Sequence, residues 1–259
     1  MILAIDVGNT NILFGCMDGE KVLFTERLST DTVKTSLEYA ILFQAALKLH
    51  KSFVEDVDGA VISSVVPPVT PVIQSALRKI IGKGKKTVVL GPGTKTGLSI
   101  RIDDPSSVGA DLVAGAVGAL VKYRPPLVVI DMGTATTLSV VDKDRNYIGG
   151  AIMPGLRLNL SSLVSGTSML GGISLNMPEH AIGHNTADAM LSGLVYGHAA
   201  MIDGLLDRME EEIGRKMTVI ATGGLASSVI PVCRHEIILD RTLLLTGMQA
   251  IYRKNVSKE

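Results

Sequence analysis

A β-hairpin is predicted at the start of the chain by the segment Met1-Ile-Leu-Ala-Ile-Asp6-Val-Gly8-Asn9-Thr10-Asn11-Ile-Leu-Phe14. The apolar residues before Asp6 predict a buried strand that ends on a carboxylate, and the polar turn leads into a second apolar strand. The tip of such a hairpin carries closely spaced backbone N–H groups, which form a concavity for phosphate oxygens. The sequence therefore predicts an anion-binding turn beside an acidic residue that can face a metal ion or its water shell.

The same pattern recurs at residues 127–141, Leu127-Val-Val-Ile130-Asp131-Met132-Gly133-Thr134-Ala135-Thr136-Thr137-Leu-Ser-Val-Val141. When Asp131 is aligned with Asp6, Gly133 falls on Gly8, and apolar strands flank both turns. Segments 60–67 and 219–226 also match, since each is an apolar strand, a turn of small residues and a helix start. Duplicated halves are therefore predicted, although any two strand-turn-strand units of an α/β protein share part of this pattern.

Composition limits the partners of the chain. Its 259 residues hold 25 Lys plus Arg and 25 Asp plus Glu, so no net field attracts nucleic acid or an anionic membrane. No uninterrupted apolar run approaches the ~20 residues of a membrane span. Cys16 and Cys233 are far apart in sequence and are expected to be buried free thiols. We expect a cytoplasmic protein with neither a nucleic-acid nor a membrane partner.

Helices and strands alternate along the chain, which is typical of α/β sheets buried on both faces. We expect two α/β lobes, residues 1–108 and 109–259, with a shared ligand cleft. An amphipathic helix is predicted after Thr30 and Asp31, which mark its start. Its buried face is expected to consist of Leu37, Ile41, Ala45 and Leu49.

Several further motifs follow the first hairpin. They are Asp103-Asp-Pro-Ser-Ser-Val-Gly-Ala-Asp111, Asp131-Met-Gly-Thr-Ala-Thr-Thr137, Gly150-Ala-Ile-Met-Pro-Gly155, Gly183-His-Asn-Thr-Ala-Asp-Ala-Met190 and Thr222-Gly-Gly224. In this order, over nearly the whole chain, they resemble type III pantothenate kinases, of the superfamily that includes acetate kinase, sugar kinases, heat-shock chaperones and actin. The resemblance implies two similar lobes of ribonuclease H-like (actin-like ATPase) fold. It also implies ATP-dependent phosphorylation of pantothenate to 4′-phosphopantothenate, the first step of coenzyme A biosynthesis.

The resemblance assigns nucleotide contacts to both hairpins. The first would hold the ATP phosphates through Asp6, Val7, Gly8, Asn9, Thr10, Asn11, Ile12 and Leu13. In the second, Thr134 would contact the nucleotide and Asp131 would bind a monovalent cation, K⁺ or NH₄⁺, while Mg²⁺ bridges phosphate oxygens. Thr222-Gly-Gly224 looks like the turn on the adenosine side. Bound cations are physically sensible here, because a protein without net charge must bring anionic ATP to an anionic substrate.

The resemblance also assigns the pantothenate contacts. They are Ile102, Gly109, Ala110, Asp111, Leu112 and Thr186. Asp111 would accept the proton of the primary hydroxyl. From the residues alone, an Asp just before an apolar helix is more often an N-cap, and Thr186 also reads as a cap. Asp6 and Asp131 have the alternative reading of turn-formers.

The chain departs from the family pattern at four positions in or near the predicted site. Leu13 stands where Lys is usual, Leu112 where Arg is usual and Ile102 where an aromatic residue is usual, and His184 replaces a common Lys. Weaker binding of pantothenate is therefore expected. Two other functions stay open: phosphotransfer to another small molecule, and a nucleotide-binding accessory or regulatory protein without turnover.

A homodimer is expected through the long helix that begins at Thr186. The family is dimeric, and this helix has more apolar and small residues than one neighbour needs. These residues are Met190, Gly193, Leu194, Gly197, Met201, Gly204 and Leu205.

Overall fold

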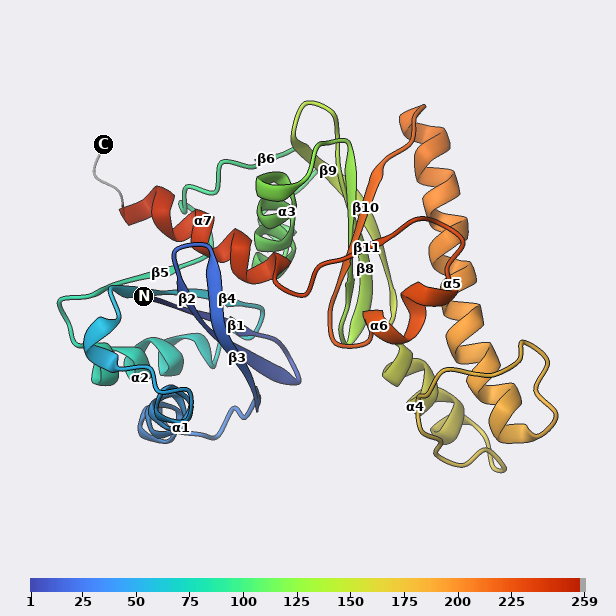
Figure 1. Cartoon of the computed structure of the whole chain (residues 1–259), viewed down its shortest axis with the longest axis horizontal. Helices are drawn as coiled ribbons and strands as arrows, with labels where there is room; N and C mark the ends of the chain where they lie inside the picture. The colour runs from blue at the N-terminus through green and yellow to red at the C-terminus, as the bar shows by residue number, and fades with distance from the viewer. Residues whose placement is uncertain (257–259) are drawn as a thin grey trace. The chain divides into compact units, whose positions relative to one another are not determined.

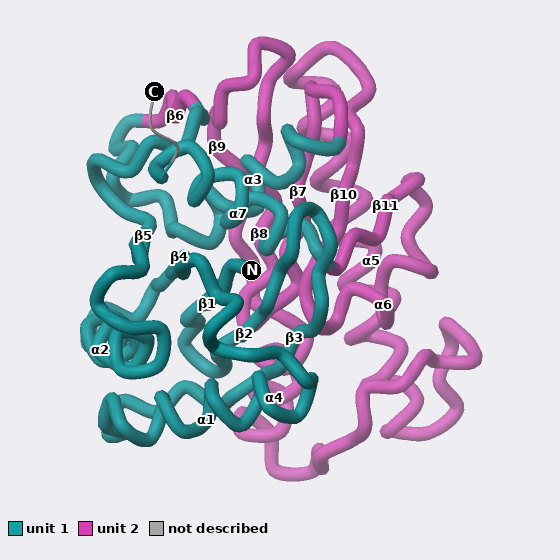
Figure 2. Tube along the Cα trace, turned by 60° about the vertical axis from the view of Figure 1, so that its left-hand side comes forward, with its two compact units in different colours: residues 1–98, 103–122, 242–259 teal, residues 99–102, 123–241 magenta. Residues whose placement is uncertain are grey.

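A computed structural model describes residues 1–256 and divides the chain into two compact units (Figure 2). Unit 1 comprises Met1–Leu98, Asp103–Lys122 and the C-terminal segment from Thr242, and unit 2 comprises Ser99–Ile102 and Tyr123–Arg241. This division differs from the expected boundary after residue 108. The difference arises because helices α3 (Ala110–Lys122) and α7 (Leu243–Val256) pack against each other within unit 1.

Unit 1 is built on a five-stranded sheet in the order β3-β2-β1-β4-β5 (Figure 1). The strands are β1 Ile2–Val7, β2 Asn11–Asp18, β3 Lys21–Ser29, β4 Gly59–Ser64 and β5 Lys86–Val89. Strands β1 to β3 form an antiparallel meander, whereas β4 and β5 join β1 in parallel. The predicted hairpin is therefore the centre of this sheet.

Unit 2 repeats this topology in a six-stranded sheet, β11-β10-β7-β8-β9-β6. The strands are β6 Ser99–Ile100, β7 Leu127–Met132, β8 Ala135–Val141, β9 Asn146–Pro154, β10 Thr218–Thr222 and β11 Ile238–Leu239. Strands β7 to β11 correspond in order and direction to β1 to β5, and β6 is an addition at the edge. The predicted duplication is confirmed, including its third segment.

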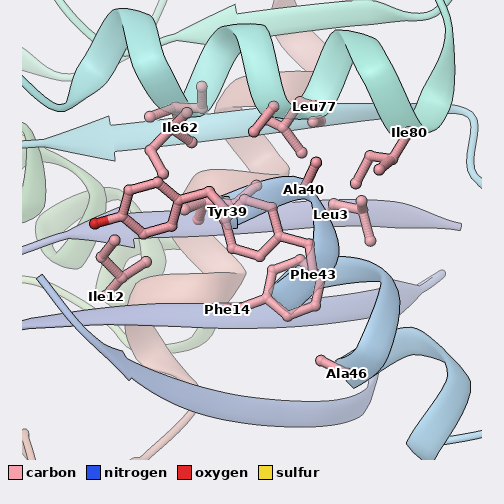
Figure 3. Close-up of a cluster of buried hydrophobic side chains, with 14 of the residues drawn as sticks. Leu3, Ile12, Phe14, Tyr39, Ala40, Phe43, Ala46, Ile62, Leu77 and Ile80 are labelled. Atoms are coloured by element: carbon pink, nitrogen blue, oxygen red, sulfur yellow. The ribbon is translucent and has the colours of Figure 1, made fainter. Parts of the chain in front are cut away.

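The core of unit 1 lies between the sheet and two helices, α1 (Ser36–Leu49) and α2 (Thr70–Ile81). Figure 3 shows Phe14 of β2 and Phe43 of α1 in contact, and their ring centroids are 4.7 Å apart. A short 3₁₀ helix, η1 (Val54–Asp56), precedes β4, and η2 (Pro105–Ser107) precedes α3.

The expected buried face of α1 is wrong. Leu37, Ile41 and Leu49 are 59%, 55% and 77% exposed, whereas Tyr39 and Phe43 are fully buried. The helix is apolar on two sides, and the side with the larger aromatic surface faces the core because it removes more apolar area from water. The helix also begins later than predicted, because its N-cap is Thr35, in a capping box with Glu38. Asp31 lies before the helix, and its backbone N–H and carbonyl are hydrogen-bonded to the Tyr39 hydroxyl.

Glycines permit the close packing of α3 on α7. A Cβ added at Gly247 would lie 1.8 Å from the Ala114 carbonyl oxygen, and one at Gly118 would lie 2.1 Å from that of Leu243. Both helices also contact β4. The segment that carries Asp111 is therefore fixed to the sheet of unit 1.

One face of the unit 2 sheet packs against α5 (Thr186–Ile213) and α6 (Ala226–Val229). Helix α4 (Leu156–Gly166) follows β9, and η3 (Ile230–Val232) follows α6. Among the described residues, α5 alone has the length and apolar composition of a membrane span, and half of the matching window is buried inside the protein. A core helix of a soluble protein passes the same test, so this observation is weak evidence for a membrane.

Candidate active site

Two hydrogen bonds fix the turn of the first hairpin. The Gly8 N–H donates to the Asn11 carbonyl (3.0 Å), and the Thr30 hydroxyl donates to the Gly8 carbonyl (2.6 Å). Asn9, Thr10 and Asn11 are exposed at the tip, whereas the side chains of Val7 and Ile12 are fully buried. Val7 and Ile12 can therefore reach a ligand only through their backbone.

Asp6 lies in a row of side chains across the sheet. It pairs with Ser63 of the parallel strand β4 and with Leu13 of β2. The Ser63 hydroxyl donates to Asp6 Oδ1 at 2.7 Å. This orienting residue was missed from the sequence. Only the parallel register of β1 and β4, which the sequence does not express, places it beside Asp6.

The Gly109–Asp111 turn lies at the same end of the unit 1 sheet. A Cβ at Gly109 would lie 2.4 Å from Asp111 Oδ1 and 3.6 Å from a methyl group of Val65. Val65 in turn donates its N–H to the Val7 carbonyl (3.0 Å), at the end of β1. Unit 1 thus brings Asp111 to the edge of the sheet that carries the exposed turn of the first hairpin.

Asp111 is not the N-cap of α3, because the helix begins at Ala110 and Asp111 is its second residue. Its Oδ1 accepts a hydrogen bond from the Leu112 N–H at 2.8 Å. Burial raises the pKa of the Asp111 carboxyl above its ordinary value, and hydrogen bonds from backbone N–H groups offset this only in part. A partly buried carboxylate whose proton affinity is increased is suited to general-base work.

The turn of the second hairpin is also closed by a hydrogen bond from its glycine. The Gly133 N–H donates to the Ala135 carbonyl (3.0 Å), and the Gly155 N–H donates to the Thr134 carbonyl (3.1 Å). A Cβ at Gly155 would lie 2.4 Å from that carbonyl oxygen, so only glycine allows this contact. Gly155 is also the N-cap of α4, so the first turn of this helix lies close to Thr134. Gly155 offers no side-chain cap to the backbone amides of that turn.

Asp131 occupies the position in unit 2 that Asp6 occupies in unit 1. It pairs with Thr222 of the parallel strand β10 and with Thr137 of the antiparallel strand β8. Gly223, with φ +97°, follows Thr222, and a Cβ there would lie 2.7 Å from Asp131 Oδ1 and 2.6 Å from the backbone N and O of Met132. The predicted Thr222-Gly-Gly224 motif therefore passes directly over the Asp131 carboxylate.

Comparison with known proteins identifies the family of this chain. A sequence model described as type III pantothenate kinase matches residues 2–208. The type III pantothenate kinase of Exiguobacterium sibiricum is 42% identical over 98% of this chain and 100% of its own length. That of Geobacter sulfurreducens is 40% identical over 98% and 99%. The chain belongs to the type III pantothenate kinase family.

Solved structures support the fold of this pantothenate kinase family member. Component A of (R)-2-hydroxyglutaryl-CoA dehydratase from Acidaminococcus fermentans matches with a TM-score of 0.60 at 16% identity, over 99% of each chain. A ROK family protein from Streptococcus pneumoniae matches with a TM-score of 0.54 at 12% identity, over 98% of each chain. At such low identity these likenesses show the fold alone, and they confirm the expected duplicated ribonuclease H-like class.

The remaining pantothenate contacts expected for this kinase belong to both units. Ala110 and Leu112 flank Asp111 in unit 1, whereas Ile102 and Thr186 belong to unit 2. Ile102 lies close to Gly149, since a Cβ there would be 4.0 Å from its methyl group. Thr186 is not a cap, because the N-cap of α5 is Asn185, whose side chain accepts from the Asp188 N–H (2.9 Å). Thr186 is the exposed first residue of that helix.

No group of three or more His, Cys, Asp or Glu side chains between residues 1 and 256 is arranged to hold a metal ion. A kinase of this family uses ATP and usually a divalent metal, and Mg²⁺ in such sites is held largely by phosphates and water. A cavity of about 680 Å³ lies at the start of β10, around Thr218, Lys216 and His235. It contains none of the predicted site residues.

Proposed function

We propose that the chain transfers the γ-phosphoryl group of ATP to the primary hydroxyl of pantothenate. The observation that carries this proposal is the Gly109–Asp111 turn. It places a partly buried carboxylate of raised pKa at the end of the sheet that also bears an exposed, amide-rich turn. Family membership supports pantothenate as the substrate, and the position of Asp111 beside the first hairpin turn within unit 1 supports its proposed role as the base.

The protein's part in such a transfer is positioning and neutralisation of charge. The backbone amides around Gly8 and Asn9 would hold phosphate oxygens, and Thr134 would also contact the nucleotide. Asp111 would orient the pantothenate hydroxyl and accept its proton as the bond to phosphorus forms. Asp6, oriented by Ser63, would face the water shell of a bound Mg²⁺, which would offset the charge of the phosphates.

We assign a monovalent cation, K⁺ or NH₄⁺, to Asp131. The residues fit such an ion, because the row Thr222, Asp131 and Thr137 places two hydroxyls beside one carboxylate. Activity should rise strongly when Na⁺ is replaced by K⁺ or NH₄⁺ at constant ionic strength, and Asp131→Ala should abolish that response. A rate in the parent protein that is indifferent to the cation would remove this ion from the mechanism.

Pantothenate should bind weakly for this family. Leu112 stands where the family usually has Arg, and losing one charge-assisted contact to the pantothenate carboxylate costs about 1.5–3 kcal/mol. That is roughly a ten- to hundredfold loss of affinity. Arg101 and Arg157 are the side chains that could replace the contact. The KM for pantothenate should therefore be high while the Asp111 chemistry is unaffected.

A homodimer through α5 is part of this proposal. Met190 and Leu194 are buried in the core of unit 2, so they are unavailable to a partner. Met201 is 42% exposed, and a Cβ at Gly193 or Gly197 would meet nothing within 4 Å. These three positions recur every four residues on an open face of α5. Light scattering should give a dimer at micromolar concentration and a monomer for Met201→Glu; a monomeric parent protein would rule the dimer out.

We place the reaction in the cytoplasm. Cys16 and Cys233 are free thiols, Cys16 buried as expected and Cys233 only partly buried, and burial raises their pKa values to about 11 and about 12. Both therefore stay protonated and unreactive, as suits a reducing compartment.

Turnover is the direct test of the proposal. The purified protein should form ADP and 4′-phosphopantothenate from ATP, Mg²⁺, K⁺ and millimolar pantothenate. ATP binding by calorimetry, with no ADP formed at saturating pantothenate and K⁺, would favour a nucleotide-binding protein without turnover. ADP formation only with a different small alcohol or acid would favour another phosphotransferase.

A further inference from the structure

The hydroxyl of Thr137 is buried and has no hydrogen-bond partner among the described residues. Thr137 lies in β8 directly opposite Asp131 of β7. Side chains that face each other in an antiparallel pair lie on the same face of the sheet, with Cβ atoms ~4.5–5.5 Å apart. The hydroxyl therefore lies on the same face as the Asp131 carboxylate and within reach of any ion bound to it.

A buried hydroxyl without a partner is costly, about 1–3 kcal/mol, and Val would fill the same space without that cost. Other buried hydroxyls of β8 are satisfied within unit 2. Thr136 Oγ1 lies 2.9 Å from His198 Nε2 on the opposite face, and Ser139 Oγ lies 3.4 Å from the Tyr147 hydroxyl. Thr137 is therefore the exception on its strand.

The internal duplication provides a comparison. In unit 1 the corresponding row is Ser63, Asp6 and Leu13, with an apolar residue opposite the carboxylate. In unit 2 the row is Thr222, Asp131 and Thr137, with a hydroxyl there instead. Packing at this position is thus compatible with an apolar side chain, and a hydroxyl in unit 2 calls for a ligand.

We propose that Thr137 is an oxygen ligand of the monovalent cation at Asp131 and sets the preference of that site for a large, weakly hydrated ion. The inference rests on the proposed cation site. Asp131 supplies the negative charge and Thr137 a neutral oxygen that replaces part of the hydration shell. A hydroxyl on a stiff β-branched side chain, fixed by the ladder, holds this oxygen at one distance from the carboxylate.

The test uses variants of the intact protein. Thr137→Val removes the hydroxyl at constant shape, Thr137→Ala removes it if Val does not fold, and Thr137→Ser restores it. Ser139→Ala is the matched control, because it removes a buried hydroxyl from the same strand and face whose partner is Tyr147. The readout is the rise of the melting temperature when K⁺ replaces Na⁺ at constant ionic strength, together with Tl⁺ binding by calorimetry.

We expect the concentration of K⁺ or Tl⁺ needed for half of the effect to increase roughly 10–100-fold in Thr137→Val or Thr137→Ala. Thr137→Ser and Ser139→Ala should stay close to the parent protein. If the parent responds to K⁺ and both hydroxyl-free variants respond equally, the role of Thr137 is refuted while the cation site at Asp131 stands. If the parent and Asp131→Ala are alike in K⁺ and Na⁺, the cation site fails and the inference fails with it.

Discussion

Gly223 is the position where one methyl group should disturb both the stability and the ion chemistry of unit 2. Its φ of +97° disfavours any other residue, and an added Cβ would lie 2.6 Å from the backbone N and O of Met132. The positive φ alone costs about 1–2 kcal/mol. Forcing a methyl group against backbone atoms adds about 1–3 kcal/mol. Gly223→Ala should therefore lower the free energy of unfolding by roughly 2–5 kcal/mol.

The matched control is Gly214→Ala at the end of α5. Gly214 also has a positive φ, +75°, but a Cβ there would meet nothing within 4 Å. This variant should lose only the conformational part, about 1–2 kcal/mol. Urea unfolding followed by circular dichroism compares the two. Gly223→Ala should in addition weaken the response to K⁺, because the new Cβ lies 2.7 Å from Asp131 Oδ1. Equal losses of unfolding free energy in Gly223→Ala and Gly214→Ala would refute the close approach of the Gly223 turn to β7 and Asp131.

Three further outcomes are expected. Phe43→Ala should cost about 3–5 kcal/mol, whereas Ile41→Ala, on the exposed side of α1, should stay within about 0.5–1 kcal/mol; equal urea midpoints would refute the inverted helix face. Burial lowers the pKa of His198 below 6.5, so its neutral form stabilises the fold above pH 6.5 and this stability is lost as the pH falls through the folded-state pKa. Between pH 7.5 and 5.5 the melting temperature of His198→Gln should therefore decrease less than that of the parent protein. An equal decrease in both proteins would contradict this. Gly109→Ala should cost little stability, because the Asp111 side chain can rotate away, yet kcat should fall at least tenfold; an unchanged kcat would show that the Asp111 position is not critical.

The duplicated strands and both Asp-x-Gly turns were predictable from the sequence, because strand periodicity and turn residues are local signals. The partner of Asp6 was not. Ser63 and Thr222 come from distant strands, and only the register of the parallel pairs places them beside the two carboxylates. Sheet register is a tertiary property that a single sequence expresses weakly.

The errors in helix α1 and at the two caps have a common cause. Leu37, Ile41 and Leu49 have helical spacing, but so do Tyr39 and Phe43, and the choice between the two faces depends on what the sheet offers opposite them. The true N-cap of α1, Thr35, lies four residues after Asp31, and that of α5, Asn185, lies directly before Thr186. Helix ends are set by local side-chain bonds of about 1 kcal/mol, and several neighbouring residues compete for them.

The central claim is that Asp111 accepts the proton of the pantothenate hydroxyl, and the Asp111→Asn variant tests it most directly. Asn keeps the size of the side chain and a hydrogen-bond acceptor for the Leu112 N–H but removes the base. With ATP, Mg²⁺, K⁺ and saturating pantothenate, kcat should fall by ~10²–10⁴, while the dissociation constant of ATP from calorimetry stays unchanged. A variant that keeps more than about half of the parent kcat would contradict the account, because Asn cannot accept the hydroxyl proton as a general base does.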